Sequence, residues 1–234
     1  MQSLSIRTYT DWNKRPSDAE DQKEPFRKYF FICEGANTEV WYFRKLIDMR
    51  KQLDIHPMID IRLMEKTEKD ANLSNPKALI EFAEAQKDVA ENKFDKKHDK
   101  MIVVFDADIY KNKPDDFKEI YEAGKKNNIL AITNPSFELF LLLHYENAYD
   151  EIIMPNSEQI LQNQKIGKRR YITILFTEKS GMNPKENPAI GELAANIRVA
   201  ICQERSLNQD VENALGNLTC NIGKIIQDIM DDVV

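Results

Sequence analysis

The sequence has few cysteines and no long apolar run, and these two features exclude several classes of protein. Its three cysteines are Cys33, Cys202 and Cys220, and no two of them form a C-x-x-C pair. Neither a disulfide framework nor a structural zinc site is therefore expected, and a reducing, cytoplasmic location fits this cysteine usage. The longest apolar runs, such as Leu139–Leu143, are far too short to cross a bilayer. The first residues also lack the plan of a signal peptide, so no membrane partner is expected.

Acidic residues outnumber basic ones, which limits how the chain could bind nucleic acid. The 234 residues include 39 acidic and 33 basic side chains, and the formal net charge is −6. Binding would need a local basic patch, or metal ions that neutralise an acidic pocket. The segment K-I-G-K-R-R offers such a patch, and phosphate contacts are predicted from Lys165, Lys168, Arg169 and Arg170. The alternative is a charged run that only faces solvent.

Short apolar runs alternate with helical patterns along residues 28–148. Four runs rich in aromatic and β-branched residues have the length and composition of buried strands: 29–33, 59–64, 101–105 and 129–133. Helical patterns lie between them, over 76–92 and 115–126 among others. Strands that alternate with helices predict βαβ units, so we expect an α/β fold whose mostly parallel sheet is flanked by helices.

The pattern changes at both ends of this region, which predicts three parts. Residues 1–27 are polar and have little periodicity, so they are expected to form a flexible N-terminal arm. Residues 28–148 would form the α/β core. Residues 149–234 begin with polar, loop-like sequence and continue with helical patterns over 189–205 and 207–231, so a mainly helical C-terminal extension is expected.

Two of the predicted strands end in acidic residues. Glu34 follows one strand, and Asp106 and Asp108 follow another. Ligand sites of open parallel sheets form beyond the carboxyl ends of the strands, so neighbouring strands would bring these carboxylates to one crevice. Crowded carboxylates stay ionised most readily around a cation, and hard oxygen ligands suit Mg²⁺ or Mn²⁺. The alternative is that each aspartate only forms a turn or caps the following helix.

Three segments of the chain resemble the RloB-like family of bacterial proteins. They are I-C-E-G-A-N-T-E-V-W-Y-F at 32–43, V-V-F-D-A-D at 103–108 and N-P-S-F-E-L-F-L-L-L-H at 134–144. The segments occur in the family's order, within residues 28–148. The resemblance implies a Toprim-like core, a place among restriction and phage-defence genes, and an ATPase partner protein.

The same resemblance assigns roles to individual carboxylates. Toprim domains of topoisomerases, primases and OLD-type nucleases use a strand-end glutamate and a D-x-D pair in phosphoryl transfer. Carried onto this chain, Glu34 becomes the general acid/base or a metal ligand, and Asp106 and Asp108 become metal ligands. The family motif also singles out Glu138 as a second metal ligand, and a glutamate in an otherwise apolar helix normally requires a partner.

Four further polar residues near these segments have both a functional and a structural interpretation. Glu39 could bind the metal, but at the start of a helix it also interacts favourably with the helix dipole. Asn134 and Ser136 could contact phosphate, and capping of the next helix explains them equally well. His144 is expected to be a hydrogen-bonded packing histidine rather than a base.

These features predict a metal-dependent phosphodiesterase with Mg²⁺ or Mn²⁺ as its cofactor. It would be a nuclease effector of bacterial antiviral defence that acts on DNA or on RNA, including tRNA. One alternative is a non-catalytic regulatory or interaction subunit of an ATPase-containing defence complex. Another is a different phosphotransfer activity on nucleotides. The sequence leaves open the choice between DNA and RNA, the number of metal ions, and assembly into a homo-oligomer.

Overall fold

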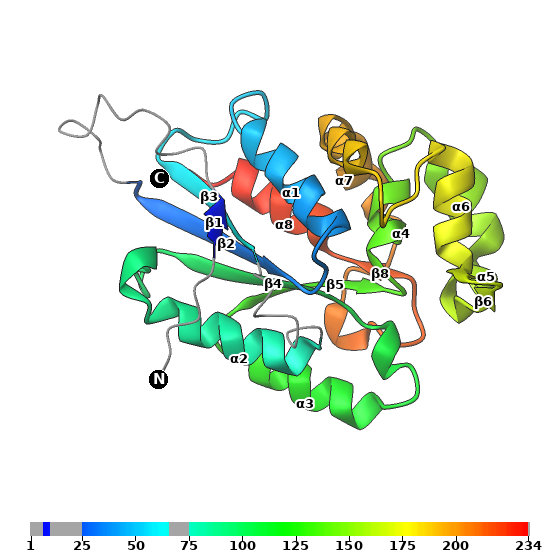
Figure 1. Cartoon of the computed structure of the whole chain (residues 1–234), viewed down its shortest axis with the longest axis horizontal. Coiled ribbons are helices and arrows are strands. Elements are labelled where there is room, and N and C mark those ends of the chain that lie inside the picture. The colour runs from blue at the N-terminus through cyan, green and yellow to red at the C-terminus, as the bar shows by residue number, and fades with distance from the viewer. Residues whose placement is uncertain (1–6, 10–24, 66–74, 234) are drawn as a thin grey trace.

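A six-stranded sheet forms the centre of the molecule. The computed structural model describes residues 7–9, 25–65 and 75–233 (Figure 1). The strands are β1 (Arg7–Tyr9), β2 (Arg27–Cys33), β3 (Ile59–Glu65), β4 (Lys100–Asp106), β5 (Ile129–Asn134) and β8 (Thr219–Cys220), in the order β1-β3-β2-β4-β5-β8. The four central strands are parallel, and β1 and β8 pair antiparallel at the two edges. The predicted α/β fold with a mostly parallel sheet is confirmed.

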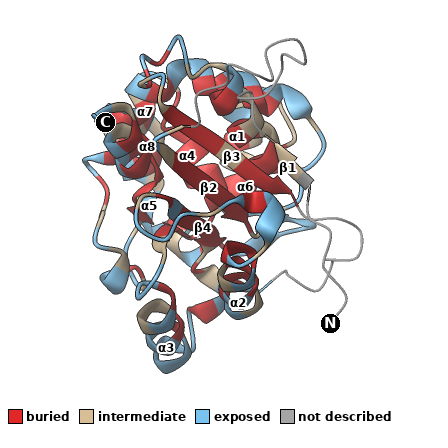
Figure 2. Ribbon diagram, turned by 90° about the vertical axis from the view of Figure 1, so that its left-hand side faces the viewer, coloured by how far each residue is buried: buried red, intermediate tan, exposed pale blue. Residues whose placement is uncertain are grey.

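Helices cover both faces of this sheet. On one face lie α1 (Thr38–Asp48), α4 (Phe137–Leu142), α7 (Ile197–Glu204) and α8 (Ile222–Met230), and on the other lie α2 (Pro76–Lys87) and α3 (Pro114–Gly124) (Figure 1). Along β2, Phe31 and Cys33 pack against the first group, whereas Phe30 and Ile32 pack against the second. Figure 2 shows the central strands buried. Because neither face meets solvent, most strand positions are apolar, which explains the continuous apolar runs in the sequence.

The chain after residue 148 is mainly helical. Helices α5 (Ser157–Gln162) and α6 (Tyr171–Ser180) flank a small hairpin of β6 (Lys165–Ile166) and β7 (Arg169–Arg170). A 3-10 helix, η7 (Pro188–Asn196), leads into α7. Within the described parts of the chain, no helix combines the length and the apolar character needed to span a membrane.

The predicted helix over 207–231 is wrong in its first half. This segment forms a short 3-10 helix (Val211–Asn213), then β8, and only then α8. Gly216 has a φ of +83°, a left-handed conformation that a helix does not contain. The side-chain amide of Asn208 donates to the carbonyls of Asp210 and Asn213, each at 3.0 Å. Side-chain bonds to the loop backbone therefore replace the helical ladder here.

The structure describes only part of the predicted N-terminal arm. Arg7–Tyr9 pair with Leu63, Met64 and Glu65 of β3, and Arg27 begins β2. For residues 1–6 and 10–24, the prediction of flexibility falls outside the described residues. The division of the chain into arm, core and extension stays a prediction.

The connections of β2 and β4 diverge beyond the carboxyl ends of these two strands. Strand β2 leads through α1 to β3, whereas β4 leads through α3 to β5 on its other side. Helices α1 and α3 lie on opposite faces of the sheet (Figure 1). Since β2 and β4 are neighbours, the loops that follow them leave the sheet in opposite directions. Such a point beyond the carboxyl ends of the strands is where ligands bind in open α/β sheets.

Candidate functional site

Glu34 and Asp106 lie side by side at this point, beyond the carboxyl ends of β2 and β4. Glu34 follows β2, and its backbone N–H donates to the carbonyl of Val104 in β4 at 2.9 Å. The Glu34 carboxylate in turn accepts a hydrogen bond from the backbone N–H of Asp106, with Oε2 and N 3.3 Å apart. The two strand-end loops therefore meet as expected from the sequence. The catalytic role of the two residues stays a prediction.

Asp106 lies in a strongly acidic environment. Burial raises the pKa of its carboxyl well above the ordinary value, and the carboxylates of Glu39, Glu138 and Glu34 raise it further. The hydroxyl of Thr133 on the adjacent strand donates to Asp106 Oδ1 at 2.5 Å, which lowers this pKa but does not offset the other effects. Carboxyl groups are thus crowded at one point, and a bound cation would favour their ionised forms.

Glu39 belongs to this acidic group because of Gly35. A Cβ atom on Gly35 would lie 2.0 Å from Oε2 of Glu39, so the glutamate carboxylate occupies the space where a side chain at position 35 would begin. Glu39 is buried in the first turn of α1. The structure therefore agrees with the helix-dipole interpretation of Glu39 and also brings its charge close to Asp106.

Glu138 is buried in the first turn of α4, with its carboxylate directed into the same acidic group. The hydroxyl of Ser136 donates to its Oε2 at 2.6 Å, and the hydroxyl of Thr173 donates to its Oε1 at 3.4 Å. Ser136 occupies the N-cap position of α4, but its side chain makes no capping bond. The capping interpretation of this hydroxyl is therefore wrong, since it binds the glutamate instead.

Lys185 supplies a positive charge that the sequence alone does not reveal. Its Nζ lies 3.7 Å from Oε1 of Glu138. Partial burial lowers the pKa of Lys185, but the carboxylates of Glu138, Glu39 and Asp106 raise it by more, so the net pKa lies above the ordinary value. The lysine is therefore protonated at neutral pH. It reaches the site from a polar loop without periodicity, and an N-P-K tripeptide is the only sequence signal there.

Two hydrogen bonds hold the loop of Lys185 against the start of α1. The Thr38 hydroxyl donates to the carbonyl of Pro184 at 2.6 Å, and the side-chain amide of Asn37 donates to the carbonyl of Lys185 at 3.2 Å. The E-G-A-N-T-E segment thus presents Glu34 and Glu39 and also anchors Lys185, whose charge acts on Glu138, Glu39 and Asp106.

Asp108 lies slightly apart from the other carboxylates, in a 3-10 turn (Asp108–Tyr110) after β4. Its Oδ2 is 3.6 Å from Nη2 of Arg170. Burial raises the pKa of Asp108, the charge of Arg170 lowers it, and that of Glu138 raises it again, so the net pKa is raised. Asp108, the second aspartate of the D-x-D pair, therefore lies between the acidic group and a basic hairpin, and the charges of both act on it.

That hairpin carries the predicted nucleic-acid-binding residues, Lys165, Lys168, Arg169 and Arg170. All four are exposed, and Gly167 forms the turn between the strands with a φ of +64°. A cavity of about 300 Å³ lies beside the hairpin, lined among others by Asp108, Arg170, Lys111 and Asn134. The structure thus brings Arg170 next to Asp108 at this cavity, whereas the binding role of the four residues stays a prediction.

The donor set fits a divalent cation in its chemistry. Carboxylate oxygens are the ligands that Mg²⁺ and Mn²⁺ prefer. In the described residues, no three histidine, cysteine, aspartate or glutamate side chains are gathered as a ready ligand set for one ion. Mg²⁺ commonly binds through one or two carboxylates and keeps several waters, so a site with fewer than three gathered ligands still matches its chemistry. Coordination by Glu34, Asp106, Asp108 and Glu138 stays a prediction.

His144 and Asn134 have structural roles. The Tyr42 hydroxyl lies 2.9 Å from Nε2 of His144, and the Phe140 carbonyl lies 3.0 Å from Nδ1. Burial lowers the pKa of His144 to about 4, so the ring is neutral, as expected for a packing histidine. The Asn134 amide donates to the carbonyls of Ala214 and Asn217 and thereby fixes the loop before β8 to the end of β5.

Comparison with known proteins identifies one family. The model of the RloB-like proteins matches residues 29–229, which includes the acidic group, the basic hairpin and the C-terminal helices. No curated protein and no solved structure gave a match. Because the family model covers most of the chain, this protein belongs to the RloB-like family.

Proposed function

We propose that this protein is a metal-dependent phosphodiesterase with a Toprim-like site, a nuclease that acts on DNA or RNA in bacterial antiviral defence. The supporting observation is the charge pattern at the switch point of the sheet. Asp106, Glu34, Glu39 and Glu138 crowd together there, and cationic side chains flank them. A partly buried acidic centre with cations at its border suits a divalent metal and the phosphate that it would bind.

Each group of this site has a role in the proposed reaction. Asp106, with Glu34 or Glu138, would hold Mg²⁺ or Mn²⁺, which when bound neutralises charge that develops on the phosphate. Lys185 and Arg170 would bind the non-bridging phosphate oxygens. Glu34, which contacts Asp106 from the neighbouring strand, would transfer a proton to or from a reacting oxygen.

A second function is favoured by the ion pairs at the same site. Asp108 and Glu138 already face Arg170 and Lys185, and carboxylates neutralised in this way need no metal. The chain would then be a non-catalytic regulatory subunit, whose partner is the ATPase that the family resemblance implies.

Incubation of the purified protein with labelled single-stranded DNA, duplex DNA and tRNA tests these proposals. Cleavage is expected with Mg²⁺ or Mn²⁺ and not with EDTA. Asp106→Ala should abolish it, whereas Asp228→Ala, which removes an exposed carboxylate on α8, should not. Cleavage that survives Asp106→Ala would contradict the assigned site. If the wild type cuts none of the substrates, even with the ATPase present, the regulatory function is supported instead.

A further inference from the structure

The cavity beside Asp108 is built by segments that are far apart in the sequence. Its volume is about 300 Å³. The loop after β4, the end of α5 with the hairpin, the end of β5 and the loop before β8 all contribute to its wall, among others through Asp108, Lys111, Leu161, Arg170, Asn134 and Leu215. Lys111 joins two of these segments, because its Nζ donates to the carbonyl of Gln162 at 3.0 Å. The cavity adjoins the acidic group, since Asp108 lines it and the charge of Glu138 acts on this aspartate.

Asn134 brings an unoccupied hydrogen-bond acceptor to the cavity wall. The side chain is only 6% exposed. Its amide nitrogen donates to the carbonyls of Ala214 at 2.9 Å and Asn217 at 2.8 Å, which determines the end of the amide at which the oxygen lies. Within the described residues, Oδ1 of Asn134 accepts no hydrogen bond, and it is not shielded from solvent. The oxygen is therefore the end of this amide that remains available to a ligand.

An available acceptor selects the kind of ligand group that Asn134 can bind. The oxygens of a phosphodiester are themselves acceptors, so they cannot donate to Oδ1, and the phosphate contact considered for Asn134 does not suit this arrangement. Nucleobases carry N–H or NH₂ groups on their edges, and these groups can donate. The orientation of the Asn134 amide thus favours a base at this position.

The other lining residues also suit a nucleotide. Leu161 and Leu215 are half-buried and present apolar surface from two separate segments. Protein pockets bind a single base through hydrogen bonds to its edge and through contact of its faces with aromatic or apolar side chains. Lys111 and Arg170 supply two positive charges against the one negative charge of Asp108. A base that carries its phosphate is complementary to this combination.

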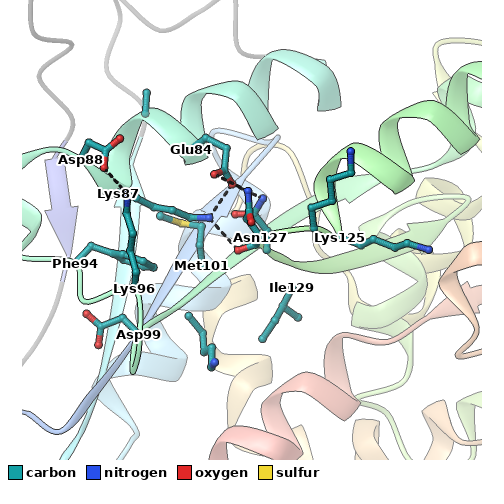
Figure 3. A pocket seen from close by; sticks show the side chains of 14 residues that line it. Glu84, Lys87, Asp88, Phe94, Lys96, Asp99, Met101, Lys125, Asn127 and Ile129 are labelled. Atoms are coloured by element: carbon teal, nitrogen blue, oxygen red, sulfur yellow. Dashed lines mark hydrogen bonds and ion pairs between the residues drawn. The ribbon is translucent and has the colours of Figure 1, made fainter.

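A wider cavity at the other end of β4 lacks these features. It has a volume of about 690 Å³ and lies at the C-terminal ends of α2 and α3 (Figure 3). Lys87 pairs there with Glu84 at 2.7 Å, and its Nζ lies 5.8 Å from the centroid of the Phe94 ring. Lys96 pairs with Asp88 at 3.0 Å. These side chains thus bind one another, whereas the Asn134 oxygen has no partner in the described part of the chain.

We propose that the cavity beside Asp108 binds one unpaired nucleobase of the substrate strand, so that the substrate is a single strand or a nucleotide that has left its base pair. This inference rests on the nuclease activity proposed above and specifies its substrate. The base would donate to Oδ1 of Asn134 and lie against the two leucines, and the two cations would contact its phosphate. The volume is at the lower end of the range for small-molecule sites, which suits one nucleotide. A base within a duplex is stacked and paired, so it cannot enter such a pocket.

Fluorescence anisotropy of the full chain with labelled oligonucleotides, in EDTA, tests this site without metal and without cleavage. The ligands are a short mixed-sequence DNA strand, the same strand in a duplex, an RNA strand of the same sequence, and an abasic DNA strand of equal length. The abasic strand keeps every phosphate and lacks the bases. The DNA or the RNA single strand should bind about tenfold or more tightly than the duplex and the abasic strand.

Leu161→Trp would fill the cavity. It should weaken binding of the base-bearing strand by about tenfold and leave binding of the abasic strand unchanged. Leu175→Trp makes the same change at a half-buried position of α6 outside the cavity and should alter neither. The proposal is overturned if the duplex or the abasic strand binds as tightly as the single strands, or if Leu175→Trp weakens binding as much as Leu161→Trp. Circular dichroism of both variants checks that the fold is retained.

Cleavage with Mg²⁺, measured separately, distinguishes this inference from the proposed function. A wild type that binds single strands as described but cuts none of the ligands would contradict the nuclease activity and support the base site. Cleavage of duplex and single strand at equal rates, unchanged in Leu161→Trp, would contradict the base site and support the nuclease activity.

Discussion

The carboxylate of Glu34 accepts a hydrogen bond from the backbone amide of Asp106, across the boundary between two neighbouring parallel strands. One side chain therefore links the two loops that diverge from the sheet at this point. The bond also turns the Glu34 carboxylate toward the position where Asp106 presents its own, so the register of β2 and β4 determines the geometry of the acidic group.

Glu34→Gln should separate the structural role of this residue from its chemical role. The amide oxygen of glutamine can still accept the bond from Asp106, so the thermal unfolding temperature should change little. The proposed proton transfer needs the carboxylate, so nuclease activity should fall by about 10²-fold or more. Activity assays and thermal melts measure the two effects. Glu34→Gln with near wild-type activity would show that Glu34 only joins the loops.

Gly35→Ala should disturb the site through Glu39. The new methyl group would overlap the Glu39 carboxylate, which must then move away from Asp106. We expect a loss of about 1–3 kcal/mol in the free energy of unfolding, as for other overpacked sites, together with reduced activity. In the Glu39→Ala background the methyl group meets no carboxylate, so there Gly35→Ala should cost much less stability. Urea denaturation of the four proteins in this cycle gives the coupling, and equal costs in both backgrounds would argue against the contact.

Asp106→Asn should stabilise the fold at neutral pH while it removes activity. The folded-state pKa of Asp106 lies above its ordinary value of 3.8, so the ionised carboxylate costs free energy on folding. That cost is fully present above the folded-state pKa and disappears as the pH falls toward 3.8, because the group is then protonated in both states. The unfolding temperature of the variant should exceed that of the wild type by a few degrees at pH 7. A difference that does not shrink on acidification would contradict this origin.

Arg170→Ala should weaken nucleic-acid binding more than Lys168→Ala. Arg170 faces Asp108 at the cavity beside the acidic group, whereas Lys168 lies at the tip of the same hairpin and outside the cavity. For a phosphate contact, the slope of log K against log salt should fall by about 1. Fluorescence anisotropy at several salt concentrations measures this slope, in EDTA to prevent cleavage. Equal effects of the two variants would indicate diffuse attraction without a defined contact.

Glu204→Ala should destabilise the C-terminal helices. The buried Glu204 carboxylate accepts hydrogen bonds from the backbone N–H groups of Gly223 and Lys224 at 2.8 and 2.7 Å, at the start of α8. Its removal leaves these donors without a partner, which costs about 1–3 kcal/mol. Glu212→Ala, at an exposed position, is the matched control and should cost much less. Urea denaturation compares the two variants.

The sequence predicts the sheet and the position of the acidic group because both depend on local patterns. The apolar runs before Glu34 and Asp106 are strands buried on both faces, and acids at the ends of neighbouring parallel strands must meet at one edge. Lys185 and β8 depend on long-range contacts. The loop of Lys185 is held by bonds to Asn37 and Thr38, far away in sequence, and no periodicity records them.

The helix predicted over 207–231 shows how a local pattern can also predict the wrong structure when long-range contacts decide the conformation. The composition of this segment is compatible with a helix. However, the backbones of Thr219 and Cys220 pair with strand β5, and the left-handed conformation of Gly216 turns the chain before this strand. In the same part of the chain, residues 171–176 form the start of α6, where Ile172 and Phe176 are four residues apart and both buried. Tertiary packing selects the conformation in both places.

The pairing of β8 with β5 makes the far end of the chain a neighbour of the acidic group. Thr133 pairs with Cys220 through its backbone and donates to Asp106 through its hydroxyl. If β8 separated from β5, the backbone of Thr133 would lose its pairing with Cys220. The Thr133 hydroxyl, which donates a hydrogen bond to Asp106, would then be held less firmly in place. The alignment of the Thr133 hydroxyl with Asp106 therefore depends on an edge strand that lies far from both residues in the sequence.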